Sequence, residues 1–206
     1  MNNEVLKNLS YGVYVLSTFD NQKSTGCIVN SLIQVTHDTV LASVNHINYT
    51  NECIKKNNKF GVSILPNDIE DEVIAKFGFQ SGRDIEKFEN IEKTNVDGID
   101  VIKNAIGYLI CEVIDTLETQ THTLFLAKIK NGEILNEKTP MTYAYYHKVK
   151  KGKSPKAAPT YIEEKNTQVG YRCKVCKYVY EGDIFSEPAD FVCPICKQPK
   201  HVFEKI

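Results

Sequence analysis

Four cysteines near the C-terminal end of the chain stand in two closely spaced pairs, Cys173 with Cys176 and Cys193 with Cys196. Sixteen residues separate the two pairs. Pairs spaced in this way can converge on one ion and surround it with four thiolates, the tetrahedral arrangement that both zinc and iron accept. The spacing therefore predicts a metal site, and it leaves the choice between zinc and iron open.

The segment that holds these pairs is short for a folded domain. It has 36 residues, 171–206. Domains shorter than roughly 40 residues usually need a metal or disulfides to fold. We therefore expect metal binding to supply part of the folding free energy. Aromatic side chains flank the pairs and are expected to form an apolar shell around the ion. These are Tyr171, Tyr178, Tyr180, Phe191 and Phe203.

The tail resembles rubredoxin in the runs YRCKVCKYVYEGD, FVCPIC and PKHVFE. The resemblance implies one iron that cycles between the ferric and ferrous states. Two features depart from the family pattern. Lys177 and Lys197 stand where rubredoxins have a glycine after each pair, and a left-handed backbone at a non-glycine residue costs on the order of 1 kcal/mol. The loop between the pairs is also short, closer to the compact form found in rubrerythrins.

The first 147 residues contain no phosphate-binding loop, dinucleotide-binding loop, zinc-protease motif or nucleophile elbow. Instead, two polar stretches, STGCIVNSL at 24–32 and SVNHINYTNECI at 43–54, fall at the expected edges of apolar strands. Hydroxyl and amide side chains where a strand meets a helix suit a ligand that has a polar ring edge and a phosphate. The sequence therefore predicts a binding site at this junction.

The elements that must position this site read as a sheet with short helices. Apolar, β-branched runs predict strands at 12–17, 26–35, 40–44, 60–65, 106–117, 121–130 and 141–147. Helices are expected at 4–10, 49–57 and 68–77. The helices interrupt the sheet without alternating regularly with its strands, which indicates a barrel with helical insertions.

From about Val5 to Tyr161 the chain resembles the flavin reductase family of FMN-binding split barrels. The resemblance is carried by YGVYVLST, TGCIVNS, SVNHINYT, FGVSIL, FGFQSGRD, THTLF and PMTYAYYH. It implies a mainly β fold, in which an FMN-binding split β-barrel with small helices is followed by the small rubredoxin-like domain. The expected boundaries are 1–147 for the flavin domain, 148–169 for an arm and linker containing lysine and proline, and 170–206 for the iron domain.

The same resemblance implies which residues contact the FMN. It places four residues along the isoalloxazine ring, largely through their backbone: Thr25, Cys27, Asn30 and Ser31. It places two beside the ribityl chain, Asn45 and His46, and two at the phosphate, Asn48 and Thr50. It implies a loop that closes over the phosphate, with Ser81 and Arg83, and one residue near the flavin or the nicotinamide, the candidate catalytic residue His122.

Ordinary structural roles remain open for several of these residues. Asn48 is also suited to cap the N-terminus of a helix. Ser81 and Asp84 have the spacing of a capping box, which would leave Arg83 in solvent. His122 is equally compatible with a structural histidine in an alternating strand.

Together, the two halves predict a converter between two-electron and one-electron chemistry. NADH or NADPH would reduce FMN, and the iron domain would carry single electrons to an acceptor protein, by resemblance a flavodiiron protein that reduces oxygen or nitric oxide. The lysine-rich arm at 148–156 would let the iron domain move. One alternative is a reductase that releases reduced FMN and carries a structural zinc ribbon. Another is a flavin-binding protein whose zinc ribbon serves for interaction.

Composition narrows the setting in which this chemistry would occur. A net charge of −1 with 25% charged residues indicates neither nucleic-acid binding nor disorder. No run approaches the roughly 18 apolar residues of a membrane span. Three isolated cysteines are expected to be core thiols, Cys27, Cys53 and Cys111. We expect a cytoplasmic protein that binds neither nucleic acid nor membrane, and by resemblance a homodimer with FMN at its interface.

Overall fold

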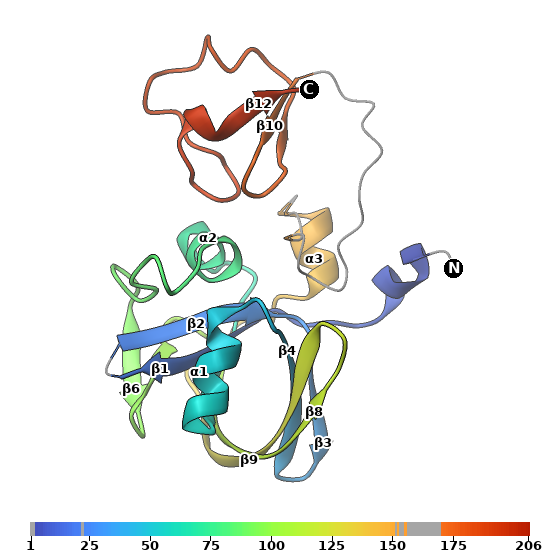
Figure 1. Cartoon of the computed structure of the whole chain (residues 1–206), viewed down its shortest axis with the longest axis vertical. Coiled ribbons are helices and arrows are strands. Elements are labelled where there is room, and N and C mark those ends of the chain that lie inside the picture. The colour runs from blue at the N-terminus through green and yellow to red at the C-terminus, as the bar shows by residue number, and fades with distance from the viewer. Residues whose placement is uncertain (1–2, 22, 151, 153–154, 156–169) are drawn as a thin grey trace.

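The computed structural model describes residues 3–21, 23–150, 152, 155 and 170–206. They form a β-sheet domain and a small C-terminal module that lies beside helices α2 and α3 (Figure 1). None of the described helices is both long and apolar enough to cross a membrane. Of the expected 148–169 arm, residues 151, 153–154 and 156–169 lie outside the described residues.

Seven antiparallel strands make the main sheet. They are β1 (Tyr14–Asp20), β2 (Lys23–Val29), β3 (Leu32–Thr36), β4 (Thr39–Asn45), β5 (Lys59–Ile64), β8 (Gly107–Glu118) and β9 (His122–Ile134). Their order is β2-β1-β5-β8-β9-β4-β3. The two outermost strands, β2 and β3, follow each other in the chain, so the sheet curls back on itself as an incomplete barrel. The expected mainly β split barrel is confirmed.

The barrel interior is filled by one face of each strand. Along β9, Thr123, Phe125 and Ala127 are buried while their neighbours are partly exposed, as the two-residue period of a strand requires. They meet Phe60 and Val62 of β5 in one apolar cluster. The pairing of β8 with β9 shifts register twice, and such bulges bend long strands enough for a sheet to curl.

Short helices and one hairpin complete this domain. The helices are a 3-10 helix (Asn3–Asn8), α1 (Tyr49–Asn57), α2 (Asp71–Phe79) and α3 (Tyr143–Lys148). The hairpin joins β6 (Lys93–Val96) to β7 (Ile99–Ile102), with Asp97 and Gly98 both left-handed (φ 51° and 83°). An Asp-Gly pair between apolar runs is a strong signal for such a turn, and the sequence analysis missed it.

Two sequence expectations about strands were wrong. Residues 26–35 form two strands rather than one, because the chain turns at Asn30 and Ser31, where the Ser31 carbonyl accepts a hydrogen bond from Ser43 N (2.9 Å). Most of residues 141–147 belongs to helix α3 (Tyr143–Lys148) instead of a strand. The Thr142 hydroxyl caps this helix by accepting from Tyr145 N (3.1 Å), and Tyr146 is buried in the core.

The C-terminal module has little regular structure. Its strands are β10 (Tyr171–Cys173), β11 (Val179–Tyr180) and β12 (Phe203–Lys205), in the order β11-β10-β12, with a 3-10 turn at Lys200–Val202. Its buried residues are the four paired cysteines and Ile184. So small a core agrees with the expectation that the module needs a metal to fold.

We predict that Gly98→Ala destabilises the protein by about 1 kcal/mol, because the left-handed backbone disfavours any Cβ. The added methyl group would meet nothing within 4 Å, so crowding cannot cause this loss. Gly78→Ala in α2 is the matched control, since its Cβ would lie 3.6 Å from Ile28 Cδ1. There we expect a gain of about 0.5–1 kcal/mol. Urea unfolding of the flavin-free protein measures both, and equal effects would contradict the argument.

Candidate functional site

The four paired cysteines meet at one point in the C-terminal module. All four are buried, and their sulfur atoms lie within 4.8 Å of one another. Two sulfur-to-sulfur distances, Cys173 to Cys196 and Cys176 to Cys193, are 3.6 and 3.5 Å. A tetrahedral ion with bonds of about 2.3 Å places its sulfurs roughly 3.8 Å apart. The cluster therefore has the size of a four-thiolate metal site.

The backbone around the two pairs repeats the same geometry. Lys177 N donates to Cys173 O (2.9 Å) and Lys197 N donates to Cys193 O (2.8 Å). Both lysines are left-handed, with φ of 66° and 57°. The two turns that the sequence analysis expected, with lysine in place of glycine, are thus present.

Apolar side chains surround the thiols. Tyr178 and Phe203 pack against them, as expected, and so does Phe79, which comes from α2 of the β-sheet domain. The remaining aromatic residues of the module contact other rings: Tyr171 with Phe185, Tyr180 with Phe191, and Phe191 with Phe203. The neighbouring thiols, Cys176 foremost, lower the pKa of Cys173 by hydrogen-bonding to its sulfur. A dry apolar shell around four thiols suits metal binding.

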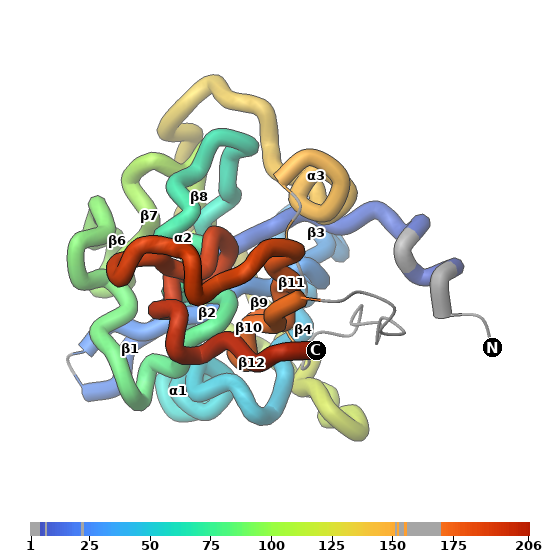
Figure 2. The backbone as a smooth tube through the Cα atoms, turned by 90° about the horizontal axis from the view of Figure 1, so that it is seen from above, coloured from blue at the N-terminus to red at the C-terminus, as the bar shows by residue number. Residues whose placement is uncertain are grey.

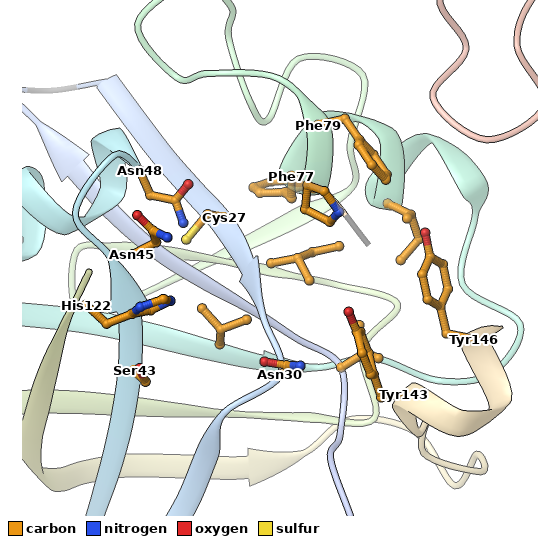
Figure 3. A pocket seen from close by; sticks show the side chains of 16 residues that line it. Cys27, Asn30, Ser43, Asn45, Asn48, Phe77, Phe79, His122, Tyr143 and Tyr146 are labelled. Atoms are coloured by element: carbon orange, nitrogen blue, oxygen red, sulfur yellow. The ribbon is translucent and has the colours of Figure 1, made fainter. Parts of the chain in front are cut away.

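A second site is a cavity of about 820 Å³, including its open mouth, between the barrel and helices α2 and α3. Figure 3 shows a polar side, with Cys27, Ser43, Asn45, Asn48 and His122, and an aromatic side. The aromatic side is formed by Phe77, Phe79, Tyr143 and Tyr146. A mostly apolar hollow with a few polar groups at one end is typical of a cofactor site.

Asn48 lies at the start of α1, on the polar side of this cavity. Its backbone is extended (φ −73°, ψ 123°), and its side chain makes no capping hydrogen bond. The capping role that remained open for Asn48 is therefore not the one it has here. The first amides of a helix lack partners within the helix and favour an anion. Asn48 stands where it can join them.

Polar atoms buried without partners test whether a ligand fits. Among the described residues, Asn30 Nδ2 and Thr25 Oγ1 are buried and have no hydrogen-bond partner. Burying such groups unpaired costs on the order of 1–3 kcal/mol each. Asn30 lines the cavity, so a ligand with an acceptor at this wall would satisfy its amide. A flavin, which has carbonyl and ring-nitrogen acceptors, fits this requirement.

The loop with Ser81 and Arg83 folds onto β2 and α1. A Cβ on Gly82 would lie 2.0 Å from Thr25 Oγ1, so only glycine allows the approach. The Ser81 hydroxyl accepts from Arg83 N (3.2 Å), whereas Asp84 N bonds to the Ser81 carbonyl (3.1 Å). This is a turn and not the capping box that was considered.

The Arg83 side chain is engaged rather than free in solvent. Its guanidinium pairs with Glu52 and lies 4.3 Å from the centre of the Tyr49 ring. The hydrogen bond to Glu52 raises the pKa of Arg83. The group stays a cation at the N-terminal end of α1, close to where an anion would bind.

Burial decides the charge of the groups that face the cavity. Burial raises the pKa of Cys27 to about 11, against weaker opposing hydrogen bonds from Thr50 and Asn48, so this thiol stays neutral at pH 7. Burial, and then the nearby His46, lower the pKa of His122. His122 Nδ1 lies 2.8 Å from Thr121 Oγ1. The cavity wall thus carries neutral groups on this side.

The expected site residues divide into two groups. Five line the cavity: Cys27, Asn30, Asn45, Asn48 and His122. Six lie outside its wall: Thr25, Ser31, His46, Thr50, Ser81 and Arg83. Of these, Ser31 donates to Asn30 Oδ1 (3.1 Å) and His46 Nε2 lies 2.9 Å from Glu118 Oε2. The isolated Cys53 and Cys111 are buried, as expected of core thiols.

The sequence analysis missed the wall that α2 and α3 provide. The missed residues are Ile74, Phe77, Gly78, Phe79, Tyr143 and Tyr146. Most are apolar residues on amphipathic helices, which sequence reasoning assigns to a core. Burial raises the pKa of Tyr146, with smaller contributions from Tyr143 and from the cysteines of the C-terminal module. Phe79 of this aromatic wall also packs against the four paired cysteines, so the wall extends to the metal site.

Comparison with known proteins accounts for both sites. Residues 6–153 match the model of the flavin reductase like domain, and residues 171–204 match the rubrerythrin, rubredoxin-like domain. The flavin reductase of the styrene monooxygenase from Pseudomonas putida S12 is similar in structure, with a TM-score of 0.59 and 26% identity. That match covers 69% of this chain and 91% of the other.

Two curated relatives extend the likeness. The ferric-chelate reductase (NAD(P)H) of Archaeoglobus fulgidus is 34% identical over 80% of this chain and its own full length. The high molecular weight rubredoxin of Moorella thermoacetica is 33% identical over the full length of both chains. The chain therefore belongs to the flavin reductase-like family, in the high molecular weight rubredoxin form that joins a flavin oxidoreductase domain to a rubredoxin-like iron domain.

Proposed function

We propose that this protein takes a hydride from NADH or NADPH onto FMN and passes single electrons through its iron to an acceptor protein. The observation that carries the proposal is the presence of two complementary sites in one chain: a cavity with an unpaired donor, and a buried four-thiolate cluster. A flavin accepts electrons in pairs, whereas a four-thiolate iron passes them singly. The protein's part is to hold the two in reach of each other.

For the flavin, we propose that the ring lies toward Asn30 and the aromatic side of the cavity. Asn45 and His46 would face the ribityl chain. Asn48 and Thr50, at the start of α1, would hold the phosphate with the free amides of the helix. Thr25, Cys27 and Ser31 support this wall from β2 and the turn that follows. Asn30 Nδ2, buried and unpartnered, supports this placement.

We propose that the loop at 81–83 closes over the phosphate and that Arg83 supplies charge there. For this role its guanidinium would exchange Glu52 for the phosphate, since arginine presents a fixed fork of donors that matches either anion. His122, neutral and half-buried on the polar side, would orient the nicotinamide. Hydride transfer itself needs no acid or base from the protein.

As acceptor we propose a flavodiiron protein that reduces oxygen or nitric oxide, in the cytoplasm, where thiols stay reduced. We also propose that two copies pair with the flavin at their interface. Exposed apolar side chains on β3 and β8 support pairing: Ile33, Val35, Ile114 and Leu117. The second candidate is a reductase that releases reduced FMN, and it is favoured if the four thiolates hold zinc, which the tetrahedral cluster also accepts.

The test is the visible spectrum of the purified protein before and after anaerobic addition of NADH, with iron and zinc measured on the same sample. We expect flavin and ferric-thiolate absorption that both bleach. Flavin bleaching beside a persistent ferric band would sink the proposal. Zinc in the cluster of protein expressed with ample iron would favour the releasing reductase.

We predict that Cys193→Ala abolishes iron binding and unfolds the C-terminal module while the barrel stays folded, because the module's core is its metal ligands. Hydrogen exchange should become fast at residues 171–206 and stay slow along β9, and NADH should still bleach the flavin. Cys111→Ala, which removes a buried cysteine far from the cluster in the sequence, is the control and should keep its iron. Retained protection of residues 171–206 in Cys193→Ala would show that the metal is not needed.

We predict that Asn48→Ala weakens FMN binding by about tenfold to a hundredfold and leaves riboflavin binding unchanged, since a hydrogen bond to a charged group contributes about 1.5–3 kcal/mol. Asn30→Ala, on the ring wall, should change the affinity for both ligands by the same factor. Titration of the flavin-free protein followed by fluorescence measures each. Equal losses for FMN and riboflavin in Asn48→Ala would remove this residue from the phosphate site.

A further inference from the structure

Phe79 touches both sites described above. It is the last residue of α2, its side chain lines the cavity, and it packs against the four buried cysteines. Among the residues that the structure describes, it alone belongs both to the cavity wall and to the shell of the thiolates. One aromatic side chain therefore stands between the flavin cavity and the metal site.

The other end of α2 contacts the C-terminal module through charge. Asp71, the first residue of the helix, has Oδ2 3.7 Å from Lys197 Nζ and Oδ1 3.3 Å from Lys150 Nζ. Lys197 directly follows the second cysteine pair. The helix thus meets the module at both of its ends, and the two views show the module lying over it (Figure 1, Figure 2).

This contact gives a reason for one of the two lysines that replace glycine. Lys197 reaches Asp71 from its left-handed position, which a glycine could not do. Lys177 occupies the equivalent position after the first pair with a similar φ. It makes no ion pair with any residue in the described part of the chain. The two lysines therefore differ in what they contact and not in their backbone.

The flavin domain holds α2 in place. The buried Lys87 donates from Nζ to Lys76 O (2.5 Å) and to Gln80 O, which caps the C-terminal end of the helix. Cations at this end of a helix are favourable. Val73 and Ile74 are buried in the domain core. A helix fixed on this side can act as a platform on the other.

We propose that α2 is the docking platform for the cysteine module within one chain, and that the Lys197–Asp71 ion pair holds the module there, with its thiolates against Phe79 at the wall of the flavin cavity. This inference rests on the proposed function. Each crossing takes one electron from the reduced flavin and converts ferric to ferrous iron. Two crossings, with an acceptor protein reoxidising the iron between them, use the electron pair of one hydride, and its proton passes to solvent.

The experiment reverses charge at the ion pair in the full chain loaded with FMN and iron. Asp71→Lys faces Lys150 and Lys197 with a like charge and should slow iron reduction by about fivefold to tenfold at low ionic strength. Adding Lys197→Glu restores the attraction and should return the rate to within about twofold of the original. Stopped-flow spectroscopy after mixing with NADH separates flavin bleaching, which should not change, from iron bleaching.

Lys177→Glu is the matched control, because it makes the same substitution at the same backbone conformation without an ion pair. It should leave the rate of iron reduction unchanged. A second readout needs no electron transfer: in zinc-loaded protein, Asp71→Lys should speed hydrogen exchange at residues 193–198, and the double variant should restore protection. Neither effect is expected from Lys177→Glu.

The outcomes distinguish the two levels of the proposal. Equal iron-reduction rates and equal exchange in Asp71→Lys, the double variant and the unaltered protein would overturn docking on α2 and leave the proposed function standing. An unaltered protein whose iron is never reduced would overturn the proposed function, and the exchange readout would still decide whether the module docks. Slow iron reduction in Lys177→Glu as well would assign the effect to the metal site rather than to the ion pair.

Discussion

The convergence of four thiolates on one point is the constraint on which the C-terminal module depends. The module's buried residues are those four cysteines and Ile184, so its core and its metal site are the same atoms. Each cysteine pair is followed by a left-handed residue, Lys177 or Lys197, whose N–H donates to the first cysteine of the pair. These turns fold each pair around the point where the sulfurs meet. Metal binding therefore fixes the outer surface of the module too, including the position from which Lys197 reaches Asp71.

The metal site could be predicted from the sequence because its ligands are close in the chain and their chemistry is narrow. The bounds of α1 agree with the expected 49–57 for a related reason, since polar residues mark both of its ends. The strand predicted at 141–147 was wrong because tyrosines favour a strand locally. The helix has a local N-terminal cap at Thr142 and buries Tyr146 against residues distant in the chain, and no local pattern reports the second contact.

The cavity was only half predictable, and the reason lies in its two walls. On the β2, β4 and α1 side, amides such as Asn30 and Asn48 are conspicuous because they interrupt apolar strands. The α2 side is built from apolar residues such as Phe77 and Phe79, which have the pattern of an ordinary core helix. Whether such a helix face meets a core or a cavity depends on what packs opposite it, which the local sequence does not report. The partner of Arg83 could not be predicted for the same reason, because Glu52 lies in a different element.

The two cofactors make opposite demands on the protein, and α2 reconciles them. The flavin needs an open cavity for the nicotinamide, whereas the thiolates need a closed apolar shell. Placing Phe79 in both walls brings the sites together without merging them. The contact is weak, because an exposed ion pair contributes at most about 1 kcal/mol. Since the module is covalently joined to the barrel, docking is intramolecular and even a weak contact is populated. Under the proposed function, weak docking on α2 suits a protein whose iron must meet first the flavin and then another protein.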